Sequence, residues 1–146
     1  MPAATFTHTQ AGLASALRIA VMRLARRLRN EREDVSLTLT QLSTLGTLAR
    51  LGPLPLGELA AAERVQPPSM TRIVSGLEER GLAVREADPK DRRLVIVRLA
   101  DEGKALLAAD RRRRDAWLNH RLRELSPDER AVLRQAVPVL EKLASL

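Results

Sequence analysis

Small polar side chains and one arginine share one side of a helix that the sequence predicts at residues 68–80. Met70, Ile73, Val74 and Leu77 recur at helical spacing, so we expect them to pack inward. The residues left outward are small or basic: Ser69, Thr71, Arg72, Ser75 and Gly76. Small side chains let a helix approach base edges, and an arginine can reach a guanine or a phosphate. We therefore predict DNA contacts from Pro68, Ser69, Thr71, Arg72 and Ser75; the alternative is an ordinary solvated helix.

A basic turn follows this helix between two predicted strands, 82–87 and 94–99. The turn contains Lys90, Asp91, Arg92 and Arg93, which we predict to contact DNA. Arginine suits a narrow minor groove, where the negative potential is enhanced. Asp91 stands two residues before Arg93 and could hold its guanidinium by a charge-assisted bond. An ordinary charged turn is the alternative.

Six helices and this hairpin account for most of the chain. We expect helices at 10–29, from an N-cap at Thr40 to 51, at 56–63, at 68–80, from a cap at Asp101 to about 123, and from a cap at Ser126 to the end. Pro67 and Pro68 suit the start of the fourth helix, and Gly81 suits its end. The predicted fold is mainly α with a small β-hairpin wing.

Composition excludes several kinds of protein. The chain has 146 residues, 45% of them hydrophobic, and no cysteine, which excludes disulfides and thiol chemistry. His8 and His120 lie far apart in sequence, and no cluster has metal-ligand spacing or the arrangement of a catalytic site. We therefore expect no cofactor, no metal and no enzyme activity. No apolar run approaches a membrane span and no signal-peptide pattern is present, so we expect a cytoplasmic protein without membrane contact.

Net charge alone supports a nucleic-acid partner only weakly. The formal net charge is +7, but residues 64–98 and residues 1–35 each contribute +3. The positive charge is therefore spread along the chain, and the pattern of the fourth helix and hairpin has to carry the argument.

The two ends of the chain predict a dimer. The last helix is apolar over more than one face from Val132 to Leu143, and Leu13 to Leu28 form a second apolar stripe. One small core can hardly cover both surfaces, so burial against a second copy is the natural solution.

These residues resemble the multiple antibiotic resistance regulator (MarR) family of bacterial winged-helix transcription factors. The matching segments are Leu39-Thr40-Gln41-Leu42, Gly52-Pro53-Leu54, Glu58-Leu59-Ala60, Pro68 to Val74, Leu77 to Leu82, Asp88 to Arg93 and Val97 to Gly103. The last two, in that order, are quite specific.

The resemblance implies one MarR-type domain over residues 1–146. Its winged helix-turn-helix lobe would span 36–100, and a dimerisation lobe would combine 10–30 with 101–146, built from the first, fifth and sixth helices. It further implies a homodimer that binds a pseudo-palindromic operator as a repressor. A small lipophilic or phenolic effector between the lobes would release the DNA. Trp117 would line that effector pocket; packing in the core or a dimer interface is the simpler alternative for it.

Three positions depart from the family pattern. Pro55 replaces the usual Thr or Ser before the third helix, which removes a cap. Arg64 aligns with the usual Gly between the third and fourth helices, at a cost of roughly 1–2 kcal/mol if the backbone there is left-handed. Ala100 replaces the usual Thr after the second strand, leaving Asp101 as the expected cap.

We therefore interpret the chain as a DNA-binding transcriptional regulator. The alternative is a winged-helix module used for protein contacts without sequence-specific DNA binding. The outward Arg72 and the basic hairpin tip count against that alternative, because a protein-contact module needs no such charge layout.

Overall fold

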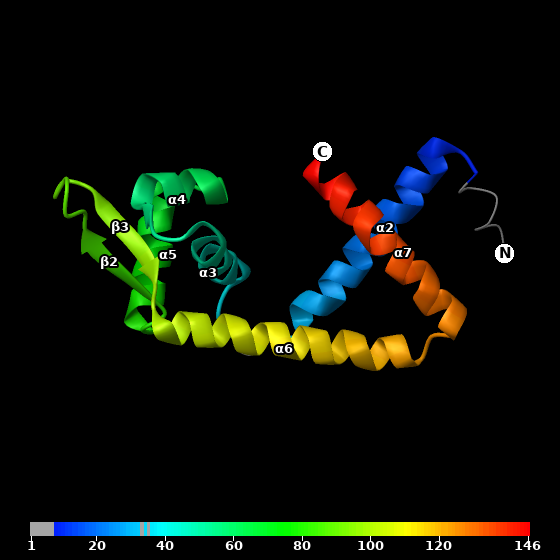
Figure 1. The fold of residues 1–146 in the computed structure, drawn as a ribbon. Helices are drawn as coiled ribbons and strands as arrows, with labels where there is room; N and C mark the ends of the chain where they lie inside the picture. The colour runs from blue at the N-terminus through cyan, green and yellow to red at the C-terminus, as the bar shows by residue number, and fades with distance from the viewer. Residues whose placement is uncertain (1–7, 33, 35) are drawn as a thin grey trace. The chain divides into compact units, whose positions relative to one another are not determined.

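The computed structural model describes residues 8–32, 34 and 36–146 (Figure 1). The described helices are α2 (Gln10–Asn30), α3 (Leu39–Leu51), α4 (Leu56–Glu63), α5 (Pro67–Glu79), α6 (Asp101–Arg123) and α7 (Pro127–Ser145). The strands are β1 (Leu54–Pro55), β2 (Ala83–Ala87) and β3 (Val95–Leu99). The fold is mainly α with a small wing, as predicted, and no described helix is long and apolar enough to cross a lipid bilayer.

The chain divides into two compact units. Residues 33–111 form the winged unit, and residues 1–32 with 112–146 form the helical unit. The helix α6 begins in the first unit and ends in the second.

The core of the winged unit fixes the position of α5. Met70, Val74 and Leu77 of α5 are fully buried, together with Leu45 of α3 and Leu59 of α4. Ile73 is partly buried against the same cluster. The predicted inward face of this helix is therefore confirmed, and its opposite face is left for contacts outside the unit.

The wing is a three-stranded antiparallel sheet in the order β1-β3-β2, and not the two-stranded hairpin that the sequence predicts. Leu54 pairs with Val97 and Pro55 with Ile96, while β2 pairs with β3 from Ala83–Leu99 to Ala87–Val95. A two-residue edge strand is too short to leave an alternating pattern in the sequence.

The helix ends follow local capping rules, with two corrections. The N-cap of α3 is Thr38 and not Thr40: its hydroxyl accepts from the Gln41 N–H, and the Gln41 side chain accepts from the Thr38 N–H. Asp101 lies inside α6 and does not cap it, because the Ala100 carbonyl already accepts the helical bond from Lys104.

Two predicted helix ends are confirmed. Ser126 and Glu129 form a reciprocal capping box at the start of α7, which continues through Pro138. Gly81 ends α5 at a φ of 71°, with Leu82 N–H donating to Leu77 O and Gly81 N–H donating to Glu78 O. Those two bonds form a Schellman motif, which needs a left-handed residue at this position.

Candidate nucleic-acid interface

The exposed side of α5 presents Arg72 without restraint. Pro67 occupies the first turn, where its missing N–H costs no hydrogen bond. Arg72 and Pro68 are exposed, and Ser69, Thr71 and Ser75 are half-buried. Among the described residues Arg72 has no ion pair or side-chain hydrogen bond. The Thr71 hydroxyl donates to Pro67 O at 3.0 Å, so its proton is already used within the helix.

The sequence predicts that Gly76 faces outward, and this prediction is wrong. A Cβ built on this residue would lie 2.9 Å from Nε2 of Gln41, so Gly76 faces α3. The same Gln41 forms the capping box of α3 with Thr38. Gly76 therefore lets α3 and α5 approach closely, and it is removed from the set of outward residues.

The wing tip between β2 and β3 is shaped by two aspartates. Asp88 accepts from the Lys90 N–H at 2.8 Å, and Asp91 accepts from the Arg93 N–H at 3.1 Å. These side-chain-to-backbone bonds are Asx-turns, which fix a tight loop without glycine. The tip therefore holds its basic side chains on an ordered backbone.

Asp91 also holds the Arg93 guanidinium, as the sequence predicts. Arg93 Nε donates to Oδ1 at 3.1 Å and Nη2 donates to Oδ2 at 3.3 Å. These bonds and the Arg93 N–H lower the pKa of Asp91. The Arg93 side chain remains 90% exposed, so it is oriented and still accessible. Lys90 and Arg92 are exposed at the same tip.

An ion pair that the sequence did not indicate joins the wing to α5. Glu78 of α5 accepts from the backbone N–H of Arg85 on β2 at 3.0 Å, and from its Nε and Nη2 at 3.3 Å each. The Arg85 side chain and its N–H lower the pKa of Glu78. Helical periodicity by itself places Glu78 on a solvated surface. No local signal pairs it with Arg85, because the contact depends on how the wing folds back onto the helix.

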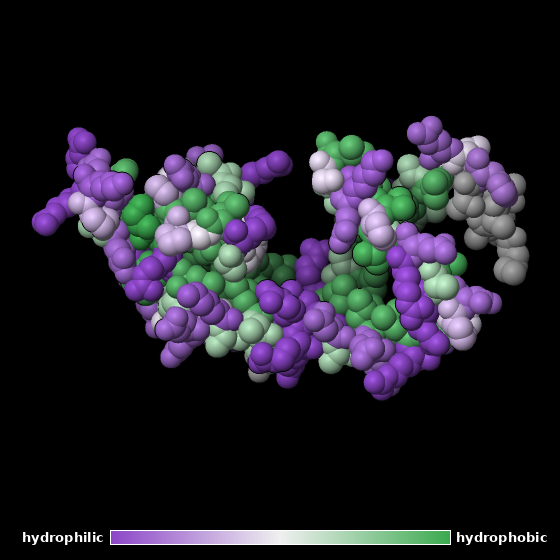
Figure 2. Space-filling model, viewed as in Figure 1, coloured by the Kyte–Doolittle hydropathy of each residue, from purple (hydrophilic) through white to green (hydrophobic). Residues whose placement is uncertain are grey.

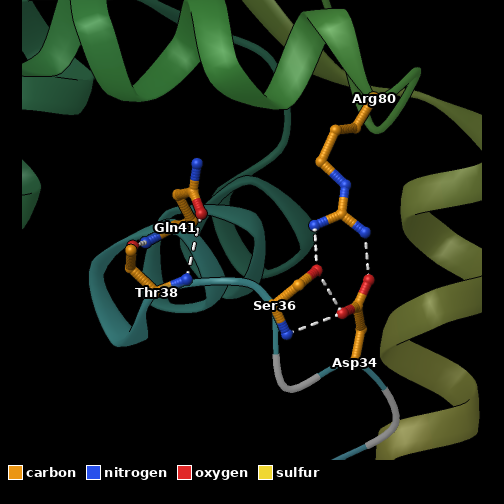
Figure 3. A network of polar contacts seen from close by, with 5 residues as sticks. All are labelled: Asp34, Ser36, Thr38, Gln41 and Arg80. Atoms are coloured by element: carbon orange, nitrogen blue, oxygen red, sulfur yellow. Dashed lines mark hydrogen bonds and ion pairs between the residues drawn. The ribbon is translucent and has the colours of Figure 1, made fainter.

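A second network holds the C-terminal end of α5 (Figure 3). Arg80 donates to Asp34 and, at 2.7 Å, to the Ser36 hydroxyl. The Ser36 hydroxyl and N–H both donate to Asp34 Oδ1. The Ser36 bonds, followed by the Arg80 bond, lower the pKa of Asp34 to about 2. The segment that precedes α3 is thus tied to the last turn of α5.

Two of the three departures from the family pattern have the predicted consequence. Pro55 precedes α4 and offers no side-chain cap hydrogen bond. Arg64 adopts a left-handed conformation with φ 55° and ψ 42° at the end of α4. Neither change alters α5 or the wing tip.

Trp117 lies in the helical unit between two arginines. The Arg27 and Arg121 guanidiniums lie 5.8 and 5.6 Å from the centre of its ring. The ring is half-buried, and its role in an effector pocket stays a prediction. No group of three or more metal-binding side chains is found within the described part of the chain.

Comparisons with known proteins agree on one family. Residues 37–95 match the MarR family. The chain is 45% identical over 135 residues to the uncharacterized HTH-type transcriptional regulator ML2140 of Mycobacterium leprae, covering 92% of this chain and 94% of that protein. It is 42% identical over 76 residues to the HTH-type transcriptional repressor NicR of Pseudomonas putida, covering 52% and 48% of the two chains.

A solved structure extends the similarity to the fold. A transcriptional regulator protein from Pseudomonas aeruginosa PA01 matches with a TM-score of 0.83 at 39% identity, over 92% of this chain and 94% of the other. The exposed α5, the braced wing and these matches lead to the same answer. The chain belongs to the MarR family of transcriptional regulators, which are not enzymes.

Proposed function

We propose that this protein is a transcriptional repressor that binds a pseudo-palindromic operator as a homodimer. The observation that carries the proposal is the exposed side of α5, where Arg72 has no partner among the described residues, beside a wing tip with an oriented Arg93. A helix in the major groove and an arginine-bearing wing at the minor groove is a two-groove mode of reading DNA. The repressor NicR and its similarity to half of this chain support the direction of regulation. A cytoplasmic location, where a bacterial chromosome lies, goes with this function.

The helical unit supports the homodimer. No residue of α7 is buried, and Val132, Val139 and Leu143 are 63%, 65% and 55% exposed. A groove of about 540 Å³ between α2 and α7 is lined by Leu17, Val21, Leu140 and other apolar residues. Figure 2 shows apolar side chains at the surface of this unit, bordered by hydrophilic ones. Exposing these apolar side chains to water costs free energy, and a second copy of the chain would cover them.

We further propose that a lipophilic or phenolic ligand releases the protein from DNA. The winged unit contains a cavity of about 410 Å³ between α3, β3 and the start of α6. Leu48, Pro53 and Leu99 give it apolar walls. Arg98 and Lys104 also line it, and they pair there with Glu86 and Asp101, from which an acidic ligand would have to draw them. This combination suits a ligand with an apolar body and an acidic group. Release of bound DNA by phenols and aromatic carboxylates, followed by anisotropy, would test it; an unchanged complex across the series would contradict it.

The test of DNA reading uses the promoter that flanks the protein's own gene. Arg72→Ala should cost about 1–3 kcal/mol per base contact and relax the preference at one position of each half-site. Arg93→Ala should weaken binding to many sequences, most at sites with narrow A·T-rich flanks. Arg50→Ala is the matched control, because it removes one exposed arginine from α3 of the same unit.

The outcomes separate the candidate functions. Loss of binding in the Arg72 and Arg93 variants but not in the control supports the proposal. No binding of the unaltered protein to any selected DNA would favour a winged-helix module used for protein contacts.

A further inference from the structure

The two units of the chain differ sharply in charge. The helical unit carries fourteen arginines and lysines against six aspartates and glutamates, a net charge of +8. The winged unit carries eleven against twelve, a net charge of −1. The unit with the DNA-reading residues therefore supplies none of the chain's excess positive charge. Long-range attraction to a polyanion has to come from the helical unit.

Ion pairs neutralise several arginines of the winged unit, although Arg72 has no partner among the described residues there. In the winged unit Arg80, Arg85, Arg93 and Arg98 each pair with a carboxylate. In the helical unit the exposed Arg18, Arg23 and Arg26 have neither an ion pair nor a side-chain hydrogen bond among the described residues. Within the described part of the chain no neighbouring carboxylate neutralises the charge of these three arginines, so it can attract an anion outside the chain.

Two other arginines of the helical unit lie at Trp117, and one of them is ion-paired. Arg27 and Arg121 both lie within 6 Å of its ring centre, and Glu124 accepts from Arg121 at 3.2 Å. Arg23 precedes Arg26 and Arg27 by three and four residues on α2, which puts the three on the same side of that helix. We call Arg23, Arg26, Arg27, Trp117 and Arg121 the Trp117 patch.

We propose that the Trp117 patch binds the nucleic-acid backbone without regard to sequence. Guanidiniums bind phosphate oxygens through paired N–H donors, and the half-buried indole of Trp117 lies against two of them, those of Arg27 and Arg121. This contact goes beyond the operator reading proposed above and does not depend on it. Its role is to hold the protein on any DNA through the unit that carries the positive charge.

The test compares two variants of the full chain on a random-sequence duplex. R23Q/R26Q removes two charges from the patch, and R112Q/R123Q removes two from α6 as the matched control, since Arg112 and Arg123 are also exposed and lie outside the α7 surface proposed for the dimer. The slope of log affinity against log salt should fall by about 0.9 for each patch arginine and stay unchanged in the control. An equal fall of the slope in both variants would mean that only overall charge matters. No fall of the slope in either variant would mean that the patch does not contact DNA. Either result overturns the proposal.

The single tryptophan of the chain gives a second, local readout. Phosphates that bind Arg27 and Arg121 change the surroundings of the Trp117 ring, so random duplex should quench Trp117 emission in the unaltered protein and much less in R23Q/R26Q. Binding with unchanged emission would overturn the proposal. If R23Q/R26Q does not keep the melting temperature of the unaltered protein, the single variants R23Q and R26Q replace it, each with half the change in slope.

Two further measurements distinguish the patch from operator reading and from membrane binding. In Arg72→Ala the quenching by random duplex should persist, so that failure of operator reading and failure of the patch give different results. Ile19 and Met22 are 44% and 52% exposed on the same helix, and a membrane would need such apolar side chains. If R23Q/R26Q loses binding to anionic phosphatidylglycerol vesicles and keeps its salt slope on duplex DNA, the patch is a membrane site and the proposal is wrong.

Discussion

Arg64 stores backbone strain in the turn between α4 and α5, and replacing it should stabilise the protein. It is the one residue other than glycine with a positive φ in the described part of the chain. Its N–H donates to Ala61 O at 3.1 Å as α4 ends, and the Val65 N–H donates to Ala60 O at 3.0 Å. This geometry requires a left-handed residue, which costs an L-amino acid with a side chain about 1–2 kcal/mol.

The expected gain from Arg64→Gly is the difference between two terms. Glycine removes the strain of about 1–2 kcal/mol. It also loosens the unfolded chain, which costs about 0.4–1 kcal/mol. The Arg64 side chain is exposed and has no described partner, so no contact is lost with it. Taking the middle of each range, the free energy of unfolding should therefore rise by about 0.8 kcal/mol, which corresponds to a melting temperature higher by about 2–3 °C.

Urea unfolding at one fixed protein concentration would measure this change, because a dimer's stability depends on concentration. The midpoint should rise while the slope of the unfolding free energy against urea stays the same. Arg50→Gly is the matched control: Arg50 is exposed in the last turn of α3, and the same replacement in a right-handed helix should lower the free energy of unfolding by up to about 1 kcal/mol. If the Arg64→Gly protein is no more stable than the unaltered one, the backbone at Arg64 does not store the strain we infer.

Three further changes test other contacts. Asp34→Asn should lower the free energy of unfolding by about 1 kcal/mol, because it weakens the ion pair with Arg80. The loss is no larger because the side chains of Asp34 and Arg80 are 24% and 38% exposed and solvent screens their attraction. The lowered pKa of Asp34, about 2 against 3.8, makes this stability complete above pH 4 and lost as the pH falls towards 2. Urea unfolding across that range would show the two proteins converge; a constant difference would contradict the ionic origin. Asp91→Ala should resemble a weaker Arg93→Ala in a binding-selection profile, since it frees the guanidinium without removing it; wild-type affinity with an unchanged melt would disprove this. Deletion of residues 127–146 should give aggregated or unfolded protein in size-exclusion chromatography, whereas a folded monomer with full DNA affinity would rule out dimerisation through the helical unit.

Features with a local physical cause could be predicted from the sequence. The bounds of α4, the glycine at the end of α5 and the capping box at Ser126 each depend on residues within one helical turn. The bond from Arg93 to Asp91 spans two residues and was likewise predictable. The N-cap of α3, Thr38 in place of the predicted Thr40, also has a local signal, since Gln41 stands three residues later and completes a capping box that Thr40 does not have.

Features that depend on the tertiary fold could not be predicted. The bond between Arg80 and Ser36 joins residues 44 positions apart, and β1 acquires its strand only by pairing with β3. The position of Gly76 against Gln41 depends on the crossing of α3 and α5, which helical periodicity does not specify. Periodicity identified the buried face of α5 and left the use of its flanks undetermined.

The flanks of α5 decide how its one arginine, Arg72, can act on DNA. The helix is held by Gln41 beside Gly76, by Arg85 on Glu78 and by the Asp34 network at Arg80. Its backbone is therefore fixed before any partner arrives, and binding costs no further entropy for it. Arg72, which has no described partner, must still be ordered on binding, and that freedom lets it adjust to a base edge.

Arg93 differs because Asp91 has already ordered it. Two of its five N–H donors are used by that carboxylate, which leaves three for phosphates or the minor groove. A fixed, exposed cation suits a groove whose shape varies little between related sites, whereas a free one suits a contact that must find a particular base. The restraint on each arginine thus gives a structural reason to expect base preference from Arg72 and sequence-independent affinity from Arg93.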